Sequence, residues 1–285
     1  MLLLTQLLNG LNASAVLLIA SLGVVVIMGH MKVVNLAHGE CIMLGAYASY
    51  YSNTVLGLPF VLSLVTAFFA TGLIGLAIER LIIRKLYGKA AETLLATYAL
   101  SLVLKQLVKM LCGPELKYVK IPYDGAFKIG NVVIPQYNVL VIAIAVVILL
   151  ITGFLFFRTR FGKKMRAING NRSMTECLGI NTSTVDLITF AYGVALAGLA
   201  GAVMAPVRGV SPFMGEQFLT DSFINVVVGG LNSLIGTTLS SALIGGSMTL
   251  LGGFWNEINA KILVFLIVIV LIRFKPNGLF RKESR

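Results

Sequence analysis

Three polar residues that could do chemistry stand close together in an apolar stretch of the chain: Asn35, His38 and Glu40. An amide, an imidazole and a carboxylate at this spacing could serve acid–base or metal chemistry, or contact a polar solute. The apolar neighbours predict membrane depth, where an ionised side chain costs roughly 2.5–3.5 kcal/mol. We therefore expect the three residues at an interface, on a water-lined pathway or paired with other protein groups.

The histidines and cysteines do not form a catalytic or metal motif. His30 and His38 lack the spacing of a zinc-protease helix, and Cys41, Cys112 and Cys177 lie in separate segments. A phosphate-binding glycine loop and a nucleophile elbow are also missing from the sequence. The sequence therefore predicts no enzyme, no metal and no cofactor bound by this chain.

A helix cap is the simplest interpretation of the polar cluster. Asn35 is a good N-cap for a helix that starts at Leu36, and Glu40 would favour the positive end of that helix. Alternatively, His38 or Glu40 faces a central polar path or a subunit interface, where Gly39 would allow close backbone approach. We expect the cluster at the cytoplasmic end of its span, stabilising the inner mouth or the interface.

The elements that position these residues are membrane helices. Of the 285 residues, 58% are hydrophobic and 12% charged, and the mean hydropathy is +0.92. The sequence predicts one all-α polytopic transmembrane domain over 1–285, with eight to nine spans. The candidate spans are residues 11–29, 36–53, 59–79, 93–112, 138–157, 187–205, 218–235, 237–253 and 258–273. The seventh and eighth nearly touch, so either could be broken or re-entrant.

Basic residues gather on one predicted side of the membrane, which we take as cytoplasmic. They are Arg80, Arg84, Lys85, Lys89, Arg158, Arg160, Lys163, Lys164, Arg166, Arg172, Arg273, Lys275, Arg281, Lys282 and Arg285. This predicts an outer N-terminus and a cytoplasmic C-terminus in a multi-pass membrane protein. Because the net charge of +12 sits at span ends, it indicates membrane lipid rather than nucleic acid as the partner.

Five lysines fall on the opposite side: Lys105, Lys109, Lys117, Lys120 and Lys128. Lys105 and Lys109 are one helical turn apart and are expected to snorkel to the outer interface. The loop at 113–137 follows them and is either a plain solvated loop or a contact for a soluble partner.

Further polar residues lie in the predicted spans. Asp221 and Asn225 share one helix face, and Asn232 follows them; they either line a pathway or gate, or hydrogen-bond between helices. Small residues at four-residue spacing predict close helix contacts over 193–201 and 241–253.

The basic loop at 158–186 predicts a short helix. Ser173 or Asn171 would cap it, and Gly179 would end it. From spacing alone, the loop either anchors the topology or offers a helix to a cytosolic partner.

Several segments together resemble the membrane subunits of bacterial ABC importers for branched-chain amino acids and for urea or short-chain amides. They are residues 34–47 (VNLAHGECIMLGAY), 165–180, 193–201 (GVALAGLAG), 226–237 (VVVGGLNSLIGT) and 273–280 (RFKPNGLF). Within this group, 92–101, 171–180 and 220–223 look more like the urea-type permease. Glu92 and Thr97 join the candidate pathway residues.

The resemblance implies a transport subunit that forms the solute path with a second, related permease. Two cytosolic ATPases that bind ATP and magnesium, and an extracytoplasmic solute-binding protein, would complete the importer. The 158–186 loop would then hold the coupling helix, with Asn169, Gly170, Asn171, Arg172, Met174, Glu176, Leu178 and Gly179 at the ATPase contact. Urea or a related amide is the expected solute; a branched-chain amino acid importer and a passive urea channel are the alternatives.

Overall fold

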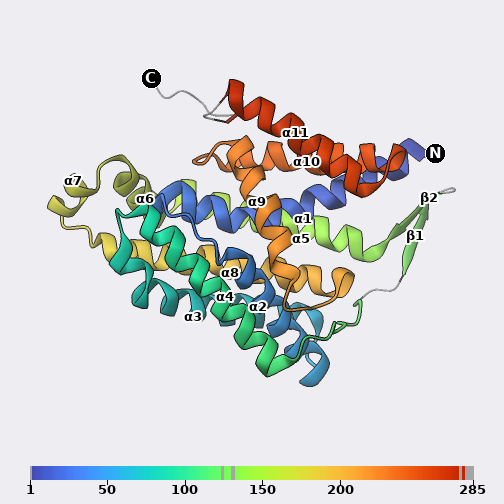
Figure 1. Cartoon of the computed structure of the whole chain (residues 1–285), viewed down its shortest axis with the longest axis horizontal. Helices are drawn as coiled ribbons and strands as arrows, with labels where there is room; N and C mark the ends of the chain where they lie inside the picture. Colours follow the sequence, from blue (N-terminus) through green and yellow to red (C-terminus); the bar gives the residue numbers. More distant parts are fainter. Residues whose placement is uncertain (1, 123–124, 130–131, 276–277, 280–285) are drawn as a thin grey trace.

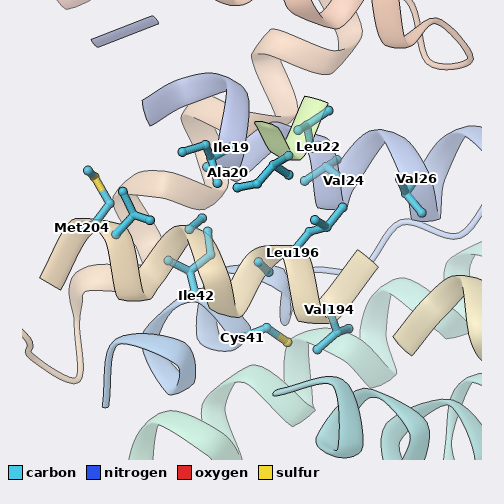
Figure 2. Close-up of a cluster of buried hydrophobic side chains, with 14 of the residues drawn as sticks. Ile19, Ala20, Leu22, Val24, Val26, Cys41, Ile42, Val194, Leu196 and Met204 are labelled. Atoms are coloured by element: carbon cyan, nitrogen blue, oxygen red, sulfur yellow. The ribbon is translucent and has the colours of Figure 1, made fainter. Parts of the chain in front are cut away.

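Helices α1 (Leu2–Met31) and α8 (Thr182–Arg208) run through the middle of the molecule and hold much of its apolar core (Figure 1). The computed structural model describes residues 2–122, 125–129, 132–275 and 278–279. In both central helices, 72% of the most apolar stretch is buried inside the chain itself. Buried side chains of α2 (His38–Tyr50) belong to the same apolar core, in which Figure 2 draws Ile42 of α2 and Leu196 of α8.

Small residues allow this central packing. A Cβ atom on Gly201 would collide with the Ile42 carbonyl of α2, and one on Gly193 would collide with Ile27 of α1. The predicted close contacts at 193–201 are therefore confirmed. Gly245 likewise lies against Ser14 of α1, in the second predicted stripe.

The remaining helices surround this centre. On one side lie α3 (Phe60–Leu81) and α4 (Ala90–Cys112), and on the other α10 (Leu234–Phe254) and α11 (Glu257–Phe274), with α9 (Met214–Gly229) between them (Figure 1). Helix α5 (Gln136–Arg158) packs against α1. A short π-helix, Tyr51–Val55, extends α2, and a short 3-10 helix, Ile83–Leu86, follows α3. The hairpin of β1 (Ala126–Ile129) and β2 (Val132–Pro135) pairs Phe127 with Ile134.

Two short helices, α6 (Arg160–Gly170) and α7 (Arg172–Cys177), lie at one end of the bundle, which we call the basic end (Figure 1). The hairpin and the N-terminus lie at the other end. The tail residues Arg281, Lys282 and Arg285, which contributed to the orientation argument, lie outside the described residues.

Among the described residues, six helices are long and apolar enough to cross a membrane: α1, α3, α4, α5, α8 and α10. This confirms a helical membrane protein, whereas eight to nine spans and the orientation of the termini stay predictions. The predicted second and seventh segments form the shorter helices α2 and α9, with 13 and 16 residues. The predicted seventh segment is interrupted near its end, because α9 ends at Gly229 and α10 begins at Leu234. Re-entry of either segment stays a prediction.

Candidate functional site

The polar cluster lies in the middle of the bundle. After α1 ends, the chain turns back alongside it, and the His38 ring lies with Nε2 3.2 Å from the carbonyl oxygen of Ala20. Because that oxygen can only accept, Nε2 carries the proton. Ala20 precedes the end of α1 by eleven residues, or about 16 Å of helix. The cluster thus lies at the start of α2 but well along α1 from its end, and its position relative to the cytoplasmic mouth stays a prediction.

The capping prediction needs correction. The helix begins at His38, with Ala37 at its N-cap, and not at Leu36. Asn35 Oδ1 accepts a hydrogen bond from the Ala37 N–H at 3.0 Å, so it stabilises the turn before the helix. The Leu36 N–H donates to Thr97 Oγ1 of α4 at 3.1 Å. Protein groups thus satisfy irregular backbone at a depth where water is scarce.

Thr97 belongs to a polar stripe along α4. Thr93, Thr97, Ser101 and Lys105 recur every four residues, so they lie on one helix face. The Ser101 hydroxyl donates to Glu40 Oε1 at 3.2 Å, and Lys105 Nζ lies 3.8 Å from the same oxygen. Lys105 thus points into the bundle, not outward as expected from its place near the span end.

Lys105 also forms an ion pair with Glu216 of α9. We call Glu40, Lys105 and Glu216 the lysine triad; it joins α2, α4 and α9. Its side chains are 3%, 16% and 60% exposed in that order. Within the described ranges, Glu40 Oε2 has no hydrogen-bond partner. The triad therefore places one cation between a buried and an accessible carboxylate.

Sequence reasoning missed Ser101, Lys105 and Glu216 as site residues. The four-residue spacing along α4 was a signal for the first two, whereas Glu216 comes close only through the tertiary fold. Among the residues that the structure describes, no three His, Cys, Asp or Glu side chains gather around a metal position. The triad offers opposite charges and hydrogen-bonding groups, which suits recognition of a charged or zwitterionic solute.

Two predicted pathway residues hold helices together. Asp221 of α9 pairs with Lys261 of α11 at 2.7 Å. Asn225 is fully buried; its amide nitrogen donates to Ser21 Oγ of α1 at 2.9 Å, and Ser240 Oγ of α10 donates to Asn225 Oδ1 at 2.6 Å. These contacts correspond to the helix–helix alternative for the 218–235 region.

The other two lie away from the triad. Asn232 is exposed in the turn between α9 and α10, next to Gly29 at the end of α1. Glu92 pairs with Lys89 at 3.2 Å, and its side chain is 55% exposed. Neither side chain joins Glu40 or Thr97.

At the basic end, the predicted short helix is present as α7. Asn171 is its N-cap and accepts from the Met174 N–H at 3.0 Å. Gly179 adopts a φ of +78°, a left-handed conformation that favours glycine. Met174 and Leu178 are 60% and 70% exposed, so the loop presents apolar side chains outward.

The loop is tied to the bundle just before α7 and at its first residue. Asn169 Nδ2, one residue before α6 ends at Gly170, donates to the Gly29 carbonyl of α1 at 3.1 Å. Arg172, the first residue of α7, pairs with Asp186 of α8 at 2.7 Å and with Glu176 at 3.4 Å.

Arg172 also contacts the α3–α4 connection. Its guanidinium lies 5.3 Å from the centre of the Tyr87 ring, and the Tyr87 hydroxyl donates to Glu79 Oε1 of α3 at 2.7 Å. Burial, and then the hydrogen bond to Glu79, raise the pKa of the Tyr87 phenol. We call Arg172, Glu176, Asp186, Tyr87 and Glu79 the arginine cluster; it links α7 to α3 and α8.

Comparison with known proteins shows that the chain is similar in sequence to transport proteins. A family model described as the permease component of the branched-chain amino acid transport system matches residues 6–272. The high-affinity branched-chain amino acid transport system permease protein BraD of Pseudomonas aeruginosa is 28% identical, with 99% of this chain and 96% of BraD covered.

Two further relatives have similar coverage. The LivH permease of the high-affinity branched-chain amino acid system of Escherichia coli is 24% identical, over 99% of this chain and 96% of LivH. A probable LivH permease of Methanocaldococcus jannaschii is 25% identical, over 93% and 89%. No solved structure matches the chain.

Proposed function

The chain belongs to the branched-chain amino acid transport permease family, and on that premise we propose that it forms the path for a branched-chain amino acid in an ABC importer. Members of this family are inner-membrane subunits that work with separate ATPase and substrate-binding components. We further propose that a second, related permease completes the path. ATP and magnesium bind to the ATPases, and this chain supplies no ATPase site.

The charges of the lysine triad favour an amino acid over urea as the solute. An amino acid presents a carboxylate and an ammonium group, which would meet Lys105 and the accessible Glu216 respectively. Urea is neutral, so a path for urea would call for donors and acceptors rather than fixed charges. The names of the relatives support the same choice, and the expectation of urea becomes the competing outcome of the test below.

Apolar groups near the triad suit a branched side chain. Tyr98 and Leu102 precede Lys105 by seven and three residues on α4, so the three share one face. Tyr98 and Leu102 are 54% and 48% exposed. A leucine-like side chain can pack there while its charged groups contact the triad.

Uptake of labelled leucine by cells with the complete importer tests this proposal. We expect unlabelled isoleucine to compete and urea not to compete. Lys105→Gln should lower leucine uptake about tenfold, which corresponds to about 1.4 kcal/mol. The matched control is Lys109→Gln, because Lys109 lies one turn further along α4 over the Phe213 ring. Urea competition with no effect of isoleucine would reverse the substrate assignment.

Helix α7 is proposed as the coupling helix. The exposed side chains of Met174 in α7 and of Leu178 just after it would enter a cleft of an ATPase. The arginine cluster would pass the movement of α7 to α8 and α3. Because α8 packs directly on α1 and α2, rocking of α8 can alternate the access of the path.

Truncation of the two apolar side chains tests this coupling. Met174→Ser with Leu178→Ser should abolish leucine uptake while the ATPases keep hydrolysing ATP. Cys177→Ser, an exposed change on the same helix, is the control and should leave uptake intact. Unchanged uptake in the double variant would remove α7 from the ATPase contact.

A further inference from the structure

A cavity of about 250 Å³ lies at the basic end, between α6 and the start of α8. It is separate from both the lysine triad and the arginine cluster. Its lining residues are Arg160, Phe161, Lys164, Ile180, Asn181, Thr184, Val185 and Ile188.

One wall of the cavity is cationic. Arg160 and Lys164 are four residues apart on α6, so their side chains lie on one helix face. In the described ranges, neither has a carboxylate within 4.0 Å. The acidic residues nearest in sequence, Glu176 and Asp186, are engaged by Arg172. The cavity therefore has uncompensated positive charge.

The opposite wall is apolar and leads into the membrane-spanning part. Val185 and Ile188 lie on α8, and Ile188 is 46% exposed. One turn further along α8, the Tyr192 hydroxyl lies 2.8 Å from Thr152 Oγ1 of α5. The cavity thus lies where the basic end meets the candidate membrane-spanning helices α5 and α8.

We propose that this cavity binds the headgroup of an anionic phospholipid, with the phosphodiester between Arg160 and Lys164 and an acyl chain along Ile188. Basic pockets at membrane-helix ends hold such headgroups by charge, while the adjoining apolar surface holds the chain. The Thr184 side chain at the rim adds a hydrogen-bonding hydroxyl. A bound lipid would also anchor α6, which leads directly into α7.

Native mass spectrometry of the complete importer, purified in mild detergent, tests this site with phosphatidylglycerol as the probe. The double variant Arg160→Gln with Lys164→Gln should retain at least about fivefold less phosphatidylglycerol than the unmodified protein. Lys163→Gln is the matched control, since Lys163 is an exposed cation on α6 that does not line the cavity. Arg160→Lys with Lys164→Arg preserves the charges and should retain the lipid.

Three results would overturn the proposal. Equal lipid retention in the double variant would place the lipid elsewhere, and an equal loss with Lys163→Gln would indicate unspecific charge attraction. Displacement of the lipid by inorganic phosphate would assign the cavity to free phosphate. Phosphatidylcholine serves as the neutral-lipid reference and should be retained equally by all variants.

Discussion

In the lysine triad and in the arginine cluster alike, one cation lies between a buried carboxylate and an exposed one. Glu40 and Asp186 are the buried partners, at 3% and 4% exposure of their side chains. Glu216 and Glu176 are the exposed partners, at 60% and 53%. The two regions therefore have the same arrangement of charges, although they lie in different parts of the bundle.

They differ in how the cation is held. Arg172 reaches Asp186 at 2.7 Å, contacts Thr182 at 3.2 Å and lies over the Tyr87 ring, so its planar fork is engaged in several directions. Lys105 is a single point charge, 3.8 Å from Glu40, which is beyond hydrogen-bond distance. We infer that the arginine cluster is a fixed joint, whereas the lysine triad can exchange partners with a passing solute.

The largest expected effect is on stability, from Arg172→Leu. This variant leaves the buried Asp186 carboxylate without its cation. We expect the free energy of unfolding to fall by about 3 kcal/mol, which is the low end for breaking a buried pair. The low end applies because the Arg172 side chain is partly exposed. Thermal melting of the purified permease measures this. Arg172→Lys keeps the positive charge and should lower the melting temperature less than Arg172→Leu does. Equal melting of all three proteins would mean that the cluster is not a structural joint.

A smaller effect separates the two pairs directly. Double-mutant cycles should give a coupling energy of about 2 kcal/mol for Arg172 with Asp186, and below about 1 kcal/mol for Lys105 with Glu40. The charged groups of the first pair are 2.7 Å apart, whereas those of the second pair are 3.8 Å apart. Unfolding of the single and double variants provides the four values for each cycle. Equal coupling energies would remove the distinction between joint and exchangeable site.

The smallest effect is expected at Glu92. Its pair with Lys89 is exposed on both sides, so Glu92→Gln should change stability by at most about 0.5 kcal/mol and leave leucine uptake unchanged. Uptake and melting in parallel provide the check. A transport defect in this variant would return Glu92 to the pathway and widen the site beyond the triad.

Local sequence patterns were enough for much of the fold. Long apolar runs predicted the membrane helices, because a spanning helix must satisfy its own backbone in lipid. Glycine spacing predicted a close helix contact at Gly201, and the structure shows that the partner is α2. A cap at Ser173 or Asn171 and a stop at Gly179 predicted the short helix that is present as α7. Each of these is a property of neighbouring residues, which is why the sequence contains it.

Helix boundaries in the polar cluster were harder. Residue type alone predicts Asn35 as the cap of a helix that starts at Leu36, yet the helix starts at His38. The backbone N–H of Leu36 instead donates a hydrogen bond to Thr97 on another helix. That hydrogen bond joins residues 61 positions apart. No local pattern could have predicted it.

By itself, the sequence determined a helical membrane transporter, its family and its candidate coupling helix. Only the tertiary structure decided that Glu40 lies at mid-bundle, that Lys105 turns inward to it and that Glu216 completes the triad. The physical reason is that a charge in an apolar environment must find its counter-charge wherever the fold brings one, and here the partners come from three separate helices.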